Sequence, residues 1–140
     1  MVTLDRVPLK EIVTVTITAI ANKSSTVALK NGERLAVQDL LYALLLQSNN
    51  DAALALASHI GGSTVKFVQI MNQKASSLGA LHSKFFNPSG LPQRGQVATA
   101  HDLAVITKAA LTDPEFRRIV ATKSYPWKSS KWEGLLENSN

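Results

Sequence analysis

The pattern of apolar and polar residues changes its period several times along the chain. Residues 12–18 alternate β-branched side chains with a period near two, which predicts a strand. Residues 26–29 and 34–37 flank Lys30–Glu33, whose Asn-Gly pair is a strong hairpin signal because both central residues of a type I′ turn need positive φ. The N-terminal part therefore predicts a strand and a short hairpin, with the polar run 22–25 as a loop between them.

From residue 37 onward the period becomes helical. Apolar residues recur on one stripe at Val37, Leu40, Leu41, Leu44 and Leu45. The segment is apolar almost all round, so we expect this first helix to lie at the centre of the fold. It ends in the polar run 47–51, whose short side chains compete with the backbone for hydrogen bonds and favour a break.

Start and stop signals delimit four more helices. They run from about Asp51 to Gly61, from Ser63 to Leu78, from Thr99 to about Leu111, and from Pro114 to Val120. Thr99 with Asp102 three residues later resembles a capping box, with Asp in the usual place of Glu. Residues 83–91 predict an extended segment that then turns, and residues 124–127 predict the start of a strand.

Composition and length limit the domain count and the class of protein. One hundred and forty residues fit one ordinary domain and exclude a second large one. The lack of cysteine excludes a disulfide framework, a thiolate zinc site and a cysteine nucleophile. The longest apolar stretch, 39–47, is far shorter than the ~20 residues that span a bilayer, and residues 1–6 do not lead into the apolar region of a secretion signal. We therefore expect no membrane segment here, and any targeting segment outside these residues.

The net charge of +5 is compatible with a polyanionic partner, but the distribution of basic residues argues against one. Lysine and arginine are scattered, and only 6% of residues are aromatic, too few for a base-stacking surface, so we expect no nucleic-acid partner. The histidines His59, His82 and His101 lack metal-ligand spacing. No G-x-S-x-G motif and no glycine-rich phosphate-binding loop occurs. We expect neither a metal nor a cofactor.

The segment around Ser48 and Asn50 carries the strongest candidate chemistry. These short polar side chains are two residues apart, so they would face different ways on a helix but can enter one cleft from a loop between two buried helices. A hydroxyl there suits proton transfer, and a carboxamide suits gripping a substrate amide. The structural alternative is a helix break with an Asx-type cap over the next helix.

A resemblance becomes specific at this segment. Ser48-Asn49-Asn50 resembles the Ser-x-Asn motif of the low-molecular-mass penicillin-binding proteins, the serine D-Ala-D-Ala carboxypeptidases, whose version commonly reads S-G-N-D-A. Between about Glu11 and Asn140 other segments match this family too: Lys30–Leu35, His59–Ser63, Phe67–Asn72, Leu78–Ala80, Phe86–Leu91, Thr99–Ala104 and Leu136–Asn140. The resemblance implies that residues 1–140 are a single, partial catalytic domain. Its expected fold is mainly α with a small β-hairpin, the helical subdomain of the serine β-lactamase and penicillin-binding (DD-peptidase) fold, lacking most of the sheet.

The family works with two further motifs, a Ser-x-x-Lys that carries the acylated serine and a later Lys-Thr-Gly on a strand. The Ser-x-x-Lys found here, Ser63–Lys66, follows the Ser-x-Asn motif, whereas in the family it precedes it, so we interpret Ser63 as a helix cap. No Lys-Thr-Gly or Lys-Ser-Gly occurs. We therefore expect both outer motifs in flanking sequence, before Met1 and after Asn140, together with the export signal of an extracytoplasmic parent protein.

The resemblance also implies a mechanism for the complete enzyme. A serine activated by a neighbouring lysine attacks the penultimate carbonyl of a peptidoglycan stem peptide ending in D-Ala-D-Ala, D-alanine leaves, and water clears the acyl-enzyme. β-Lactams are further ligands of that enzyme. In this scheme Ser48 relays a proton to the leaving amine and Asn50 holds the substrate amide. Asn49 stands where glycine is common, which narrows the loop's conformations, and Asp51 is expected to act as a helix N-terminal charge.

Without its nucleophile this chain is expected to hydrolyse nothing. Two alternatives of other classes stay open. One is a non-catalytic module that binds muropeptides through the Ser48 loop. The other is a structural helical domain whose apolar faces meet a missing sheet or a partner chain, with oligomers as the expected consequence.

Overall fold

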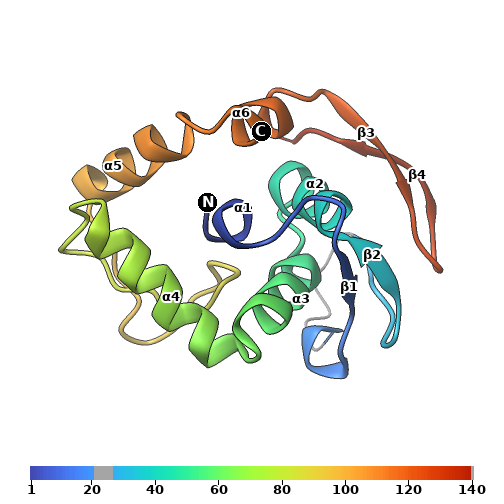
Figure 1. The fold of residues 1–140 in the computed structure, drawn as a ribbon, viewed down its shortest axis with the longest axis horizontal. Coiled ribbons are helices and arrows are strands. Elements are labelled where there is room, and N and C mark those ends of the chain that lie inside the picture. The colour runs from blue at the N-terminus through green and yellow to red at the C-terminus, as the bar shows by residue number, and fades with distance from the viewer. Residues whose placement is uncertain (21–26, 140) are drawn as a thin grey trace.

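The computed structural model describes residues 1–20 and 27–139 and is mainly helical (Figure 1). Its elements in chain order are α1 (Val2–Arg6), β1 (Ile12–Thr14), the 3-10 helix η1 (Ile17–Ile20), β2 (Arg34–Ala36), α2 (Val37–Gln47), α3 (Asn50–Gly61), α4 (Thr64–Ser77), α5 (Ala100–Ala110), α6 (Pro114–Val120), β3 (Ser124–Lys128) and β4 (Glu133–Glu137). β1 pairs with β2, and β3 with β4, in two separate antiparallel sheets. Within the described ranges no helix has the length and apolar character needed to cross a membrane.

The five helices expected from the sequence are confirmed as α2 to α6, each within a residue or two of its expected ends. Their caps explain this agreement. The Ser63 hydroxyl accepts a hydrogen bond from the Lys66 N–H at 3.2 Å and so caps α4 as expected. At α6, the carboxylate of Asp113 accepts from the N–H groups of Glu115 and Phe116, and Pro114 occupies the first turn. These short polar signals act locally, so the sequence alone locates them.

Helix α2 lies at the centre of the fold, as its all-round apolar sequence predicts (Figure 1). Alanines of α3 pack against one side of it, where their small side chains allow a close approach. On another side α6 and the β3–β4 hairpin cover it with Ile119, Trp127 and Leu136, each at most 2% exposed. Burial of each large side chain contributes roughly 1.5–3 kcal/mol. The C-terminal end of α2, where the candidate residues lie, is therefore fixed by packing on several sides.

The hairpin expected between residues 26–29 and 34–37 is wrong. β2 pairs with β1, with Val13 opposite Leu35, and strand β1 ends at Thr14, earlier than expected. The Asn-Gly turn is present, but of its two central residues only Gly32 has positive φ, so it is not type I′. Val27 and Leu29 are buried without joining a strand because buried side chains of the 49–51 segment take their backbone hydrogen bonds. Thr26 and the expected loop 22–25 lie outside the described residues.

The prediction of a capping box at the start of α5 is confirmed for Thr99 but not for Asp102. The Thr99 hydroxyl accepts from the Asp102 N–H at 3.1 Å, as a cap should. The fully buried Asp102 carboxylate, however, accepts from the His82 N–H at 2.7 Å and the Ser83 hydroxyl at 2.8 Å, and the Thr99 N–H donates to Ser83. Aspartate is one methylene shorter than the usual glutamate, and here it anchors the neighbouring 82–83 segment to the start of α5.

Candidate functional site

The candidate loop joins the end of α2 to the start of α3, and its backbone is unusual at one point. Ser48 adopts the left-handed conformation, with φ 51° and ψ 41°, and is the only non-glycine residue with positive φ in the described ranges. Asn49 returns to an extended conformation, with φ −72° and ψ 110°, and its N–H donates to the Ala43 carbonyl at 3.2 Å. Left-handed geometry at a non-glycine residue is unfavourable and persists only where its surroundings enforce it.

Exposure alternates along the loop. Ser48 is exposed and Asn50 half-buried, whereas Asn49 and Asp51 are 0% and 2% exposed. The Ser48 hydroxyl makes no hydrogen bond to any residue that the structure describes. The two residues expected to carry the chemistry are thus the two that keep contact with solvent, while the residues between and after them turn inward.

Asn49 carries the cap that the sequence offered as the alternative explanation of this segment. Its side-chain oxygen accepts from the Ala52 N–H at 2.9 Å at the start of α3, and its amide group donates to the Val27 carbonyl at 2.7 Å. Asn49, between Ser48 and Asn50, therefore supplies both the cap of α3 and the bond to the 27–29 segment. Sequence reasoning missed this role, although an asparagine directly before an alanine-rich helix is a strong cap signal.

Asp51 has a wider role than the helix N-terminal charge expected of it. It does lie in the first turn of α3, where a negative charge is favourable. It is also 2% exposed, and its carboxylate accepts from the Leu29 N–H at 3.4 Å. Asn49 and Asp51 together hold the 27–29 segment against the inner side of the loop.

The other side of the loop is held from the C-terminal end of the chain. The Leu46 carbonyl, in the last turn of α2, accepts from both the N–H of Ser139 at 3.1 Å and its hydroxyl at 2.8 Å. The Gln47 side-chain amide donates to the Glu137 carbonyl. The last turn of a helix has carbonyls with no partner inside the helix, and residues some 90 positions later supply the missing donor here.

A polar cluster joins the first half of α2 to β3. The rings of Tyr42 and Tyr125 stack with centroids 3.6 Å apart, and Arg118 donates to the Tyr42 hydroxyl at 2.8 Å. The Tyr125 hydroxyl donates to Asp39 at 2.6 Å. Burial, together with this bond to a carboxylate, raises the pKa of Tyr125 to about 12, so the phenol stays protonated over the working range of pH.

Two of the three histidines share a neighbour, but within the described residues no group of three metal-ligating side chains forms. His82 and His101 both flank the buried carboxylate of Asp102, at 3.9 Å and 3.4 Å, while their own side chains are largely exposed. Burial by itself raises the pKa of Asp102, but hydrogen bonds from Ser83 and the His82 N–H outweigh it and the pKa is lowered. His59 forms a separate pair with Glu11 at 2.6 Å.

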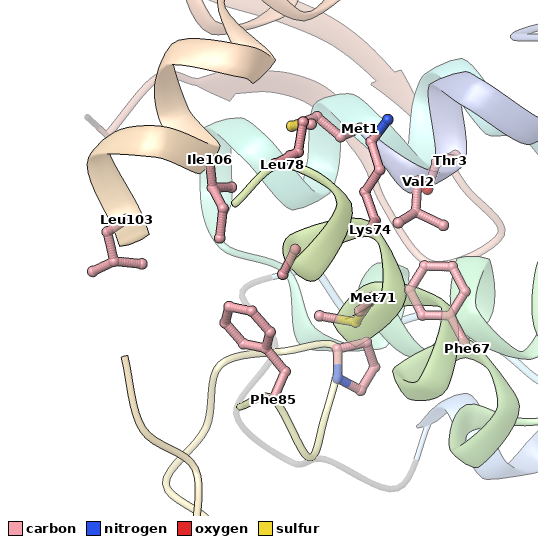
Figure 2. Close-up of a pocket in the computed structure, with 12 residues that line it drawn as sticks. Met1, Val2, Thr3, Phe67, Met71, Lys74, Leu78, Phe85, Leu103 and Ile106 are labelled. Atoms are coloured by element: carbon pink, nitrogen blue, oxygen red, sulfur yellow. The ribbon is translucent and has the colours of Figure 1, made fainter. Parts of the chain in front are cut away.

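A cavity of about 320 Å³ lies away from the candidate loop, and neither Ser48 nor Asn50 lines it. Side chains of α1, α4 and α5 surround it, among them Phe67, Met71 and Leu103 (Figure 2). The polar group of its lysine, Lys74, is paired with Asp5 at 2.9 Å. The cavity is therefore an apolar gap between helices with no catalytic grouping, and α5 is correspondingly exposed, with Leu103 48% accessible.

Comparison with known proteins gives one consistent result. The chain matches the family described as D-alanyl-D-alanine carboxypeptidase over residues 2–140. It is 37% identical over 142 residues to the D-alanyl-D-alanine carboxypeptidase DacB2 of Mycobacterium tuberculosis, covering all of this chain and 48% of that protein. It is 40% identical over 105 residues to DacD of Escherichia coli, covering 74% of this chain and 27% of that protein.

Solved structures agree on the fold. The crystal structure of the D-alanyl-D-alanine carboxypeptidase from M. tuberculosis superimposes with a TM-score of 0.92 at 38% identity, over 99% of this chain and 53% of that one. The Streptomyces K15 DD-transpeptidase superimposes with a TM-score of 0.85 at 30% identity, over 99% of this chain and 60% of that one. The fold is thus the penicillin-binding (DD-peptidase) fold expected from the sequence, mainly helical with small antiparallel sheets, and the chain spans about half the length of these structures.

Proposed function

Because the chain belongs to the D-alanyl-D-alanine carboxypeptidase family, we propose that residues 1–140 form part of the catalytic domain of a serine-type enzyme acting on peptidoglycan stem peptides that end in D-Ala-D-Ala. The observation that carries the proposal is the geometry of the 48–51 loop. Its inner residues, Asn49 and Asp51, are buried and bonded to the 27–29 segment. The exposed Ser48 and the half-buried Asn50 keep contact with solvent on a backbone that is held from both sides. Because peptidoglycan lies outside the cytoplasm, the complete enzyme would work there.

In the proposed reaction each outer residue has one task. The exposed Ser48 hydroxyl passes a proton to the nitrogen of the departing D-alanine as the bond between the acyl carbon and that nitrogen breaks. The Asn50 carboxamide, with both donors and an acceptor, grips the amide of the bound peptide and sets its register. A serine hydroxyl supplied by a Ser-x-x-Lys motif forms the acyl-enzyme, which water then hydrolyses, and the same acylation traps β-lactams.

Among residues 1–20 and 27–139, no serine followed by a lysine three positions later is placed as that nucleophile. The chain's one Ser-x-x-Lys serine, Ser63, caps α4 by accepting a hydrogen bond from the Lys66 N–H. We therefore propose that the 140-residue chain neither releases D-alanine nor forms a covalent penicillin adduct. Loss of a serine nucleophile removes most of the rate enhancement of such an enzyme.

Incubation with a D-Ala-D-Ala peptide, and separately with a fluorescent penicillin, tests this. We expect no D-alanine and no labelled band. Turnover that disappears in Ser63→Ala would show that Ser63 is a nucleophile after all. Turnover that survives Ser63→Ala would place the nucleophile elsewhere in the chain, and either result would overturn the proposed inactivity.

A second candidate function is binding without catalysis. The Ser48 hydroxyl is exposed and the loop that carries it is held by hydrogen bonds within these 140 residues, which favours a module that still recognises the muropeptide terminus. Titration with a stem peptide would then give saturable binding that Ser48→Ala and Asn50→Ala weaken. Ser76→Ala, at an exposed serine on α4, is the matched control and should leave binding unchanged.

A further inference from the structure

The C-terminal end of α2 accepts a hydrogen bond from a hydroxyl far away in the sequence, that of Ser139. We propose that Ser139 is a positioning residue for Ser48, because it fixes the helix turn from which the Ser48 hydroxyl is presented. This inference rests on the proposed function for the importance of Ser48, but the structural dependence it asserts can be measured without any ligand.

The carbonyl of Leu46 needs a hydrogen-bond donor from outside its own helix. This group belongs to the last turn of α2, where no intrahelical N–H can reach it. Ser139 gives it two donors, a backbone N–H at 3.1 Å and a hydroxyl at 2.8 Å. Leu46 is fully buried, so water does not compete easily for the same carbonyl.

Ser48 lies two residues beyond the Leu46 carbonyl. Its left-handed backbone is one that residues other than glycine rarely adopt, so it must be held by its neighbours. Beyond Ser48, Asn49 is held by hydrogen bonds of its side chain to Val27 and to Ala52 of α3, and of its N–H to the Ala43 carbonyl of α2. On the α2 side Ser139 provides the corresponding restraint, since the Leu46 peptide plane cannot rotate without breaking both of its bonds.

Ser139 is itself held in place through the hydrogen bonds of its neighbour Asn138. The preceding residue, Asn138, donates its side-chain amide to the carbonyls of Val120 and Thr122 at 3.0 and 2.9 Å, at the end of α6. Its backbone N–H donates to Lys123 at 2.8 Å. Figure 1 shows the C-terminal end of the chain beside α6. The restraint on Ser48 is therefore transmitted from α6 and the β3–β4 hairpin, and not from a loose tail.

The test is residue-resolved amide hydrogen exchange on the 140-residue chain. Ser139→Ala keeps the backbone donor and loses the hydroxyl, so the fold should survive while the Ser48 and Asn49 amides exchange roughly fivefold to tenfold faster. Ser139→Thr keeps a hydroxyl and should restore slow exchange. Ser129→Ala is the matched control, because it removes a hydroxyl bond to the Trp132 carbonyl at the other end of the same hairpin.

Two results would overturn the inference. One is unchanged exchange at Ser48 and Asn49 in Ser139→Ala. The other is an equal acceleration of amides throughout α2 and α3, which would mark Ser139 as a general stabiliser. If exchange responds locally but a D-Ala-D-Ala peptide does not bind even the unmodified chain, the second candidate function, binding without catalysis, fails while the positioning role of Ser139 stands.

Discussion

Replacement of Asn49 tests how the loop is built. Asn49→Ala removes the cap of α3, which costs about 1 kcal/mol, and leaves the buried Val27 carbonyl without its donor, which costs about 1–3 kcal/mol more. The expected loss in the free energy of unfolding is therefore about 2–4 kcal/mol. Asn49→Gly, which installs the residue common in the family motif, should lose a similar amount because glycine adds backbone entropy to the missing Val27 bond.

Two variants divide this loss into its parts. Asn49→Ser keeps a good cap and loses only the bond to Val27, so it should fall between the unmodified chain and Asn49→Ala, with about 1 kcal/mol separating the two variants. Ser63→Ala is the control, since it removes a cap that has no tertiary bond in addition. Urea unfolding followed by circular dichroism gives the free energies of unfolding of all five chains, the unmodified one included. If Asn49→Ala is no more destabilising than Ser63→Ala, the Val27 bond does not hold the loop.

Three further predictions concern pH and association. Burial and the bond to Asp39 raise the pKa of Tyr125 to about 12. The stability that Tyr125 contributes is therefore complete below pH ~10 and is lost as the pH rises toward 12. Tyr125→Phe should flatten the alkaline side of a plot of unfolding free energy against pH. Hydrogen bonds lower the pKa of Asp102 against the effect of its burial, so the stability that its carboxylate contributes is complete above pH ~4 and is lost as the pH falls below that value. Asp102→Asn should flatten the acid side of the same plot. An unchanged slope in either variant would contradict the role given to that residue. Exposed apolar side chains such as Leu103 and Leu135 should promote self-association, which size-exclusion at rising concentration detects; a monomer throughout would count against it.

Local signals explain why the helices could be predicted from the sequence. Ser63, Asp113 and Thr99 each cap a helix through a bond to an N–H two or three residues later, so a short window contains the whole interaction. The central place of α2 follows equally directly from its all-round apolar surface. These features need no knowledge of the rest of the chain.

The features that the sequence did not predict depend on contacts between residues far apart in the chain. Residues 27–29 do not pair with residues 34–37 as a hairpin, because the side chains of Asn49 and Asp51, over 20 residues later, bond to the backbone of Val27 and Leu29. The clamp of Ser139 on Leu46 spans 93 positions and has no local signature. Ser48 and Asn50 could be proposed from their motif, but the reason they face outward, the inward commitment of Asn49, depends on such distant contacts.

The central claim is that Ser48 and Asn50 contact a D-Ala-D-Ala terminus on a chain that cannot cleave it. Amide chemical-shift titration with a stem peptide, with free D-alanine measured in the same sample, tests both halves at once. We expect saturable shifts at the 48–50 loop whose binding curve Asn50→Ala weakens and Ser76→Ala preserves, with no D-alanine released. Shifts confined to other regions, binding that Asn50→Ala leaves intact, or release of D-alanine would contradict the claim.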